Sequence, residues 1–198
     1  MMSLRNPNTV IGVVGGAASG KDTVADAFTR FGYEHVSSSD SVREEILARG
    51  KQPSRPLQTE IANEMRATEG SSYWVKQSLR DVREGQLVVI SGLYAPGEGE
   101  FIQKCIRGLI VGVVASLDAE SDLNARFHRL IDRADGSRDQ LDYNAFLAAH
   151  QRENSGTSSG ETNIGQLLGR ADFTIVNNGP LADIHHQVEN IVNEIRRV

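Results

Sequence analysis

A glycine-rich segment that directly follows an apolar run is the feature that most narrows what this chain can fold into. The apolar run is TVIGVV, residues 9–14, and the segment after it is GGAASGKDT, residues 15–23. It matches the pattern G-x-x-x-x-G-K, in which small residues let successive backbone N–H groups surround phosphate oxygens. Such a loop needs a buried strand before it and a helix after it, because the helix N-terminus adds partial positive charge. The sequence therefore predicts a phosphate-binding loop between a parallel strand and a helix.

The side chains of this loop are expected to have separate roles. Lys21 supplies a mobile full charge for the bridging and terminal phosphates. The next position normally carries the Ser or Thr that holds Mg²⁺. Here it is Asp22, so Thr23 becomes the expected phosphate-side hydroxyl and a candidate magnesium ligand. The residues expected to bind the phosphates are Gly15, Gly16, Ala17, Ala18, Ser19, Gly20, Lys21, Asp22 and Thr23.

Along the rest of the chain, the hydrophobic period switches repeatedly between strand-like and helix-like, which is typical of an α/β protein. The length of 198 residues suits a single domain. The helical patterns between about residues 40 and 84 are longer than the connection between the second and third strands requires. We therefore interpret this segment as an insert in the domain. The predicted strands are 9–14, 33–36, 87–90, 109–117 and 173–176.

Composition and charge exclude several classes of partner. The chain has 21 basic and 26 acidic residues, a net charge of −5 and no basic run, so we expect no nucleic-acid platform. No apolar run approaches the ~18 residues of a membrane span, and the first residues lack an apolar signal-peptide core. We therefore expect a cytoplasmic protein without membrane contact. Its single cysteine, Cys105, leaves no internal disulfide and no cysteine-based metal site.

The residues that follow the other strands narrow the class of phosphate-loop protein. A GTPase needs an Asn-Lys-x-Asp guanine reader, and none of the four lysines follows an asparagine. Many ATPases carry a metal-binding Asp at the end of a neighbouring strand, but the third strand ends in Ser91 and Gly92. Asp118, after the fourth strand, is either a metal ligand or a plain polar residue at a strand end. These patterns disfavour a GTPase.

Two charged residues follow the second predicted strand, at the edge of the sheet where ligands of open α/β proteins bind. Ser41 and Glu44 match a Ser-x-x-Glu capping box, which predicts a helix from Ser41 to Ala48 and leaves Asp40 free for other work. Arg43 lies in the first turn of that helix, where a cation opposes the helix dipole. A bound anion would explain this arginine, and a solvated side chain is the alternative.

Three arginines recur on a helix predicted over residues 119–133. Arg126, Arg129 and Arg133 are spaced i, i+3 and i+7, which puts them on one helix face. Because acidic residues are interspersed with them, an ordinary charged face is the competing interpretation. The polar stretch QRENSGTSSGETN, residues 151–163, predicts a surface loop.

Several short segments resemble one group of enzymes. Gly-Lys-Asp-Thr is similar to the Gly-Lys-Gly-Thr of adenylate kinase and its relatives, and SDSVR, residues 39–43, is similar to their Gly-Asp-x-x-Arg. Other segments resemble nucleoside monophosphate kinase-like and dephospho-coenzyme A kinase-like proteins. Leu93 and Tyr94 depart from the pattern, because some relatives have an arginine there. The other similar segments are Arg55 and residues 44–50, 63–66, 90–92 and 171–179.

This resemblance covers most of the chain and implies a three-layer P-loop kinase fold over residues 1–198. The expected sheet is parallel and five-stranded, in the order 2-3-1-4-5. The insert at about 40–84 is expected to bind the acceptor, and a lid at about 126–163 is expected to carry arginines that neutralise the transferred phosphoryl group.

The activity that the resemblance implies is phosphoryl transfer from ATP, with Mg²⁺, to a small nucleotide-like acceptor such as a (deoxy)nucleoside monophosphate. One alternative is a dephospho-coenzyme A kinase, whose acceptor is a ribose hydroxyl. Another is an ATP-binding regulatory protein with little turnover, and a homodimer is compatible with each. The implied roles are catalysis by Lys21, Asp40, Arg129 and Arg133, acceptor binding by Arg43, Arg55 and Arg126, and weaker metal roles for Thr23 and Asp40.

Overall fold

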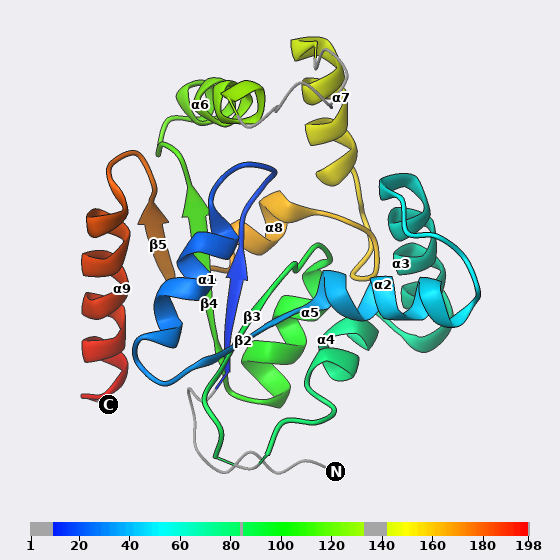
Figure 1. The fold of residues 1–198 in the computed structure, drawn as a ribbon, viewed down its shortest axis with the longest axis horizontal. Coiled ribbons are helices and arrows are strands. Elements are labelled where there is room, and N and C mark those ends of the chain that lie inside the picture. The colour runs from blue at the N-terminus through cyan, green and yellow to red at the C-terminus, as the bar shows by residue number, and fades with distance from the viewer. Residues whose placement is uncertain (1–9, 84, 133–141, 198) are drawn as a thin grey trace.

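The structure, a computed structural model, describes residues 10–83, 85–132 and 142–197. Its strands are β1 (Val10–Val14), β2 (Glu34–Ser37), β3 (Val88–Ser91), β4 (Leu109–Val114) and β5 (Phe173–Val176). They form one parallel sheet in the order β2-β3-β1-β4-β5 (Figure 1), which confirms the predicted fold class and strand order. The first strand is central, because Val10 pairs with Val88 of β3 and Ile11 pairs with Leu109 of β4.

The connections between the strands are helical. In the part of the chain that the structure describes, no helix is long and apolar enough to cross a membrane. The helices are α1 (Lys21–Thr29), α2 (Ser38–Ala48), α3 (Arg55–Glu69), α4 (Tyr73–Ser78), α5 (Pro96–Glu100), the π-helical turn η1 (Phe101–Cys105), α6 (Ala119–Asp132), α7 (Tyr143–Glu153), α8 (Ile164–Leu168) and α9 (Leu181–Ile195).

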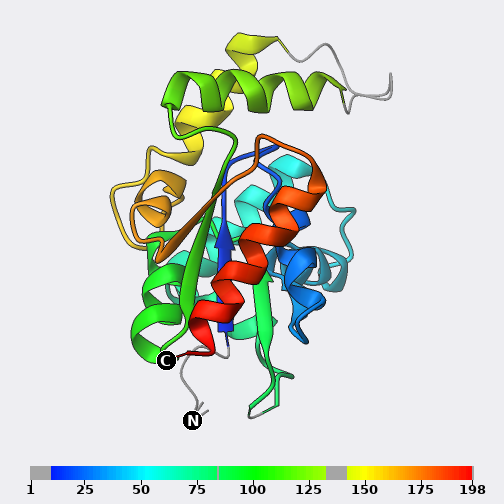
Figure 2. The ribbon, with the colours of Figure 1, turned by 90° about the vertical axis from the view of Figure 1, so that its left-hand side faces the viewer.

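Helices cover both faces of the sheet, so the domain has three layers (Figures 1 and 2). The side chains of β1 alternate between them: Ile11 and Val13 pack with residues of α1 and α9, and Val10 and Val14 pack with residues of α4, η1 and α8. A strand buried on both faces needs apolar residues at every position. This explains why the segment before the glycine-rich loop is apolar throughout.

A separate small core holds together α2, α3 and α4, at the right of Figure 1. It contains Val42, Ile46, Ile61 and Trp74. The indole N–H of Trp74 donates to the Ala62 carbonyl at 3.1 Å. Since a buried indole N–H needs an acceptor, this bond makes Trp74 a satisfied core residue.

Helix α2 begins three residues earlier than the sequence predicts. Its first residue is Ser38, not Ser41, so the expected capping box does not form. The Ser41 hydroxyl instead lies 3.0 Å from the Ser78 hydroxyl of α4. The reason is tertiary: Ser38 is buried directly after β2, and its hydroxyl donates to the Gly92 carbonyl beyond the end of β3.

A buried ion pair joins α3 to the short helix α5, which follows β3. The Arg66 Nε lies 2.9 Å from Glu98 Oε1, and the two side chains are 3% and 0% exposed. The other carboxylate oxygen of Glu98 accepts from the N–H groups of Tyr94 at 2.7 Å and Ala95 at 3.0 Å. Because a buried charge without its partner is costly, this pair fixes the α2–α4 unit against the sheet.

Helices α6 and α7 lie beyond the carboxyl ends of the central strands, at the top of Figure 1. Phe127 of α6 packs against Tyr143 and Phe146 of α7, with ring centroids 5.0 Å and 5.6 Å apart. Aromatic pairs at these separations stabilise the contact beyond simple area burial. The two helices therefore form a small unit that covers the edge of the sheet at which the glycine-rich loop lies.

The polar stretch 151–163 is only partly the surface loop that the sequence predicts. Its first three residues complete α7. The Gly97 N–H donates to the Ser159 carbonyl at 2.8 Å, and the Asn163 N–H donates to the Tyr94 carbonyl at 2.8 Å. These bonds tie the connection between α7 and α8 to the turn after β3 and to the start of α5.

Candidate functional site

The loop between β1 and α1 has the backbone of a phosphate cradle. Ala18 and Gly20 have φ angles of 60° and 91°, and such left-handed residues let consecutive N–H groups form an anion-binding concavity. The N–H groups of Ala17, Ala18, Gly20 and Lys21 have no acceptor among the described residues. Helix α1 begins at Lys21, so its positive dipole end lies at the same place. The loop therefore offers free donors to phosphate oxygens.

Three glycines of this loop stand where a side chain does not fit. A Cβ atom on Gly15 would lie 2.7 Å from the backbone of β4. One on Gly16 would collide with the Arg126 guanidinium, and one on Gly20 would collide with the Asn177 amide. At Gly15 the obstacle includes backbone, whereas at Gly16 and Gly20 it is the end of a side chain that would have to shift.

The Ser19 side chain is a second sign that the loop is built to bind a polar group. Its hydroxyl is buried, and the described residues offer it no hydrogen-bond partner. Buried polar atoms are nearly always paired. An orphaned hydroxyl beside four free N–H groups fits a loop that binds the oxygens of a phosphate.

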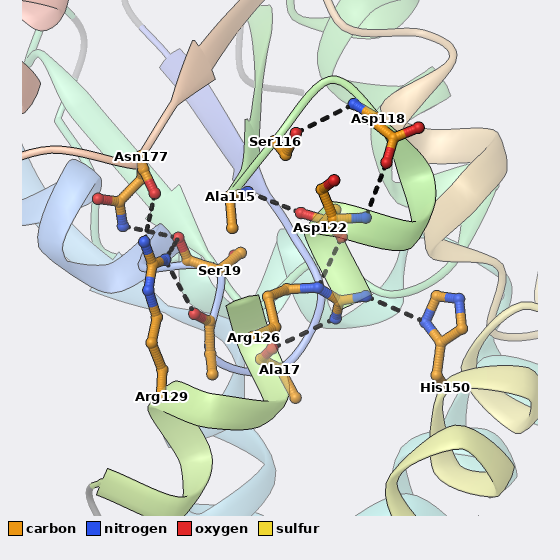
Figure 3. Close-up of polar contacts among 12 residues, drawn as sticks. Ala17, Ser19, Ala115, Ser116, Asp118, Asp122, Arg126, Arg129, His150 and Asn177 are labelled. Carbon is orange, nitrogen blue, oxygen red and sulfur yellow. Dashed lines mark hydrogen bonds and ion pairs between the residues drawn. The ribbon is translucent and has the colours of Figure 1, made fainter. Parts of the chain in front are cut away.

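Arg126 of α6 is almost completely buried against this loop (Figure 3). Its Nη1 donates to the Ala17 carbonyl at 3.3 Å, and its Nε donates to Asp122 at 2.7 Å. Its Nη2 lies 3.4 Å from His150 Nδ1. Burial and the Arg126 charge lower the pKa of His150, against a smaller opposing effect of Asp122. In this structure Arg126 supports the cradle, and its acceptor-binding role stays a prediction.

Arg129, one turn along α6, links the loop to the end of β5 (Figure 3). Its Nη1 lies 3.4 Å from the Ala18 carbonyl and 3.5 Å from the Ser19 carbonyl, and its Nη2 donates to the Asn177 carbonyl. The Asn177 side chain donates to the Ser19 carbonyl at 2.8 Å. Neighbouring elements thus bind the loop through its carbonyl groups, which leaves its N–H groups for a ligand. Arg133, the third predicted arginine, lies outside the described residues.

A cavity of about 280 Å³ opens beside the loop, where β2 and β3 end. It brings together Lys21 from the loop with Asp40 and Arg43 from the first turns of α2, which the sequence predicts separately. The Arg43 guanidinium forms an ion pair with the Asp40 carboxylate. The residues that line the cavity are Lys21, Asp22, His35, Ser37, Ser39, Asp40, Arg43 and Ser91.

Asp22 faces this cavity at the position where related loops carry a hydroxyl. Its carboxylate lies 3.1 Å from the Lys21 ammonium. Burial raises the pKa of this carboxyl, but the charge and hydrogen bond of Lys21, with smaller contributions from Ser91 and His35, outweigh burial and lower the pKa from its ordinary value of 3.8. Asp22 is therefore ionised at neutral pH.

The residues present fit Mg²⁺ only as a site shared with phosphate oxygens and water. Over the described ranges, no group of three or more His, Cys, Asp or Glu side chains is placed to hold a metal ion. Mg²⁺ usually takes one or two protein carboxylates and completes its shell with phosphates and waters. Asp22 and Asp40 line the cavity, whereas Thr23 does not. The magnesium roles of Thr23 and Asp40 stay predictions.

Arg55 is the exposed first residue of α3 and is not among the residues that line the cavity. It lies close enough to Glu153, the last residue of α7, to act on that carboxyl. Burial raises the pKa of Glu153, and the charges of Arg55, Arg126 and Lys21 oppose this rise. The Arg55 charge thus acts on Glu153, and the predicted contact of Arg55 with an acceptor stays a prediction.

The sequence patterns missed a row of three polar residues. His35 of β2 lies between α1 and β3, with Nδ1 2.6 Å from Asp26 Oδ1 and Nε2 3.0 Å from Ser91 Oγ. His35 and Ser91 both line the cavity. The only signal was Ser91, which stands where an acid is common at a strand end. No motif could reveal the row, because three separate segments supply its members.

Solved structures of other proteins share this fold at low sequence identity. The protein TT1252 of Thermus thermophilus superposes with a TM-score of 0.60 and 21% identity, over 96% of this chain and 98% of that one. Shikimate kinase from Acinetobacter baumannii has a TM-score of 0.53 and 15% identity, over 95% and 93%. Dephospho-CoA kinase from Campylobacter jejuni has a TM-score of 0.52 and 16% identity, over 96% and 98%. The fold is that of P-loop kinases.

Sequence comparison identifies the family. No family model matches the chain. A UPF0200 protein of Pyrobaculum aerophilum is 30% identical to it over 188 residues, which are 94% of this chain and 98% of that protein. The match includes nearly the full length of both proteins, and the chain therefore belongs to the UPF0200 family.

Proposed function

We propose that this chain is a cytoplasmic small-molecule kinase that transfers the γ-phosphoryl group of ATP, with Mg²⁺, to a nucleotide-like acceptor. The observation that carries the proposal is the cavity that Lys21 shares with Asp40 and Arg43. Phosphates held by the loop and Lys21 would face Arg43, a second cation that can bind an anion. A protein that only binds a nucleotide does not need a second anion-binding residue, such as Arg43, opposite the phosphates.

On the donor side, the backbone performs most of the binding. The free N–H groups of the loop and of the start of α1 bind phosphate oxygens. The ammonium group of Lys21 binds the terminal phosphate. Mg²⁺, when bound with the nucleotide, would neutralise part of the charge that develops on the phosphates. Asp22 and Asp40 are the cavity carboxylates that would contribute to holding it.

On the acceptor side, Arg43 is the expected anchor. Its guanidinium suits the bidentate geometry of a phosphate or carboxylate. The sequence predicts Arg43 in the first turn of this helix, but α2 begins at Ser38, so Arg43 lies in the second turn and the helix dipole gives no argument for an anion there. Asp40 pairs with Arg43 in the structure. An acceptor phosphate would take over the contact with Arg43 and release Asp40 for Mg²⁺ or water.

Phosphoryl transfer asks the protein for positioning and charge neutralisation more than for covalent chemistry. Arg129 fits this role, because its guanidinium already lies beside the cradle. Arg133 is proposed to act with it. Shikimate kinase and dephospho-CoA kinase, whose fold this chain shares, are by name kinases of small molecules, which supports the same reaction class here.

The test is an acceptor panel assayed for ADP release with ATP and Mg²⁺. Nucleoside monophosphates and dephospho-CoA form the panel, and we expect slow turnover with ATP alone and strong stimulation by one acceptor, because a kinase excludes water until its acceptor is bound. Arg43→Gln should raise the acceptor KM by about 10- to 100-fold, the value of ~1.5–3 kcal/mol for hydrogen bonds to a charged group.

Arg80→Gln is the matched control, because Arg80 is an exposed arginine whose ion pairs lie away from the cavity. It should leave both KM values unchanged. If ATP binds but no acceptor in the panel stimulates turnover, the kinase proposal fails and an ATP-binding regulatory protein becomes the better description.

A further inference from the structure

Two members of the row Asp26–His35–Ser91, His35 and Ser91, line the cavity, and Asp26 lies behind His35. The register of β2 and β3 explains how the row forms. His35 pairs with Val89 and Ser37 with Ser91, so the side chains of His35 and Ser91 are diagonal neighbours on one face of the sheet. Helix α1 covers this face, and it places Asp26 against the far side of the imidazole.

The tautomer of His35 sets the direction of the hydrogen bonds in this row. An ionised carboxylate only accepts, so the Nδ1 of His35 carries the proton and donates to Asp26. The Nε2 of the neutral ring is then an acceptor, and we assign the Ser91 hydroxyl, which also interacts with the Asp22 carboxylate, as its donor. The lone pairs of Ser91 Oγ remain to accept a further proton.

Ser91 is the last residue of β3 and is closed off from bulk solvent, yet it lines the same cavity as Lys21 and Arg43. A carboxylate at such a strand end would hold a metal or its water. A hydroxyl backed by an imidazole and a carboxylate is suited instead to receiving a proton, since the imidazole accepts it and the carboxylate stabilises the resulting cation.

We propose that this row takes up the proton of an acceptor alcohol, so that the reacting atom of the acceptor is a hydroxyl oxygen. The proposal rests on the kinase function above. The alcohol O–H bond breaks, a bond forms from that oxygen to the γ-phosphorus, and the bond from the γ-phosphorus to the β–γ bridging oxygen breaks to release ADP. The alcohol proton passes to Ser91 Oγ as the serine proton passes to His35 Nε2. The imidazolium, stabilised by Asp26, later returns its proton to water.

An acceptor phosphate would have no use for such a row. Its second pKa is about 6, so its oxygens are mostly ionised at pH 7 and need no base. Asp40, the other carboxylate on the acceptor side, pairs with Arg43 in the structure, and we assign it to Mg²⁺ or water once the anion of the acceptor takes over that arginine. The acceptor that fits both features is an alcohol that also carries an anionic group, with the anion on Arg43 and the hydroxyl at Ser91.

The charged groups around His35 come from two helices. Lys21, Asp22 and Asp26 belong to α1, and Asp40 and Arg43 belong to α2. Lys21, Asp22, Asp40 and Arg43 line the cavity together with His35. Asp26 contacts the imidazole ring directly. Protonation of His35 would remove the acceptor at Nε2, so we expect turnover to fall at acidic pH.

The first experiment identifies the atom that is phosphorylated. The full chain is incubated with ATP and Mg²⁺ and with AMP or dephospho-CoA, each of which carries both phosphate and ribose hydroxyl groups, and the product is analysed by ³¹P NMR. A new phosphomonoester on a hydroxyl is expected. A new phosphoanhydride alone overturns this inference and leaves the kinase proposal intact, whereas no product of either kind overturns both.

The second experiment tests His35 as a positioning residue that acts through Ser91. His35→Gln should lower kcat by about 10²- to 10⁴-fold, the usual range for general-base catalysis, and should abolish the acidic limb of the pH–rate profile at an unchanged ATP KM. His186→Gln, an exposed histidine on α9, is the control. An equal loss at every pH, with the acidic limb retained, would mean that His35 is only structural.

A third measurement needs neither acceptor nor turnover. Nitrogen-15 NMR of the imidazole rings should find His35 protonated at Nδ1 in its neutral form, and Ser91→Ala should shift its Nε2 resonance. If the neutral ring carries its proton at Nε2 in the wild-type chain, the direction of the row is reversed and the proposal is wrong.

Discussion

The two sides of the cavity are built in different ways. The donor side is a loop in which several backbone N–H groups have no acceptor among the described residues. Its neighbours Arg126, Arg129 and Asn177 hold it through its carbonyl groups. On the acceptor side, side chains such as His35 and Arg43 line the cavity. A backbone site depends on contiguous small residues, whereas a side-chain site depends on how separate segments are brought together. The first is therefore shared by many proteins, and the second decides the substrate.

The largest expected effect tests whether ATP binding on the donor side is independent of how the α2–α4 unit is held in place. Glu98→Gln should lower the stability by about 3–5 kcal/mol, because it leaves the Arg66 charge buried without its partner. Thermal unfolding measures the loss, and a folded variant should still gain stability from ATP. Glu44→Gln, which breaks the exposed pair with Arg80, should change stability by at most ~1 kcal/mol. A loss of ATP binding in the folded Glu98 variant would mean that the two sides depend on each other.

The next effect isolates the donor side. ATP at a hundred times its dissociation constant should stabilise the chain by about 2.7 kcal/mol. Lys21→Ala should remove most of this gain, since hydrogen bonds to a charged group contribute ~1.5–3 kcal/mol, and should leave the melting temperature without ATP nearly unchanged. Lys51→Ala, an exposed lysine, is the control. An undiminished ATP effect in Lys21→Ala would contradict the cradle.

A smaller effect separates backbone shape from close packing. Gly20 and Gly32 have φ angles of 91° and 90°, but only Gly20 has a neighbour, Asn177, where a Cβ would lie. Alanine at either position should cost about 1–2 kcal/mol for the left-handed backbone. Gly20→Ala should in addition displace Asn177 and weaken ATP binding. Equal ATP affinity in the two variants, measured by titration calorimetry, would show that the packing of Asn177 is unimportant.

The smallest effect concerns pH. Burial raises the pKa of Glu153 above its ordinary value of 4.5, despite Arg55, Arg126 and Lys21. Its contribution to stability is therefore greatest below pH 4.5 and is lost as the pH rises through the raised value. Glu153→Gln should be slightly more stable than the wild type at pH 7, and the difference should shrink in acid.

The same variant should bind ATP slightly more tightly at pH 7, because one negative charge near Lys21 is removed. Glu189→Gln, an exposed residue of α9, serves as the control for both measurements. A stability difference that grows as the pH falls would contradict the assigned shift.

The donor side and the sheet could be predicted from the sequence, whereas much of the acceptor side could not. The G-x-x-x-x-G-K spacing and the apolar strand before it predict the loop directly, and hydrophobic periods predict the strands. The spacing of Arg126 and Arg129 predicts a shared face, but not that Arg126 is buried against the loop. Spacing along one helix carries no information about which partner faces it.

The start of α2 and the row at His35 were missed for a related reason. Ser38 begins the helix because its hydroxyl bonds to Gly92, a residue from another strand end. His35 meets Ser91 only because β2 and β3 pair in one particular register. Local patterns favour the capping box at Ser41, and tertiary contacts override it.

The central place of β1 also determines when the cradle can form as the chain is synthesised. The loop leaves the ribosome early, but β1 pairs only with β3 and β4, so its sheet neighbours exist only once residue 114 has emerged. The contacts from Arg129 and Asn177 come later still. Until residue 91 has emerged the apolar β1 has no sheet partner, and until residue 114 it has only β3. An unpaired apolar strand is the condition under which nascent chains aggregate or engage chaperones. A nucleotide that binds the cradle would act on the last steps of folding and not on the first.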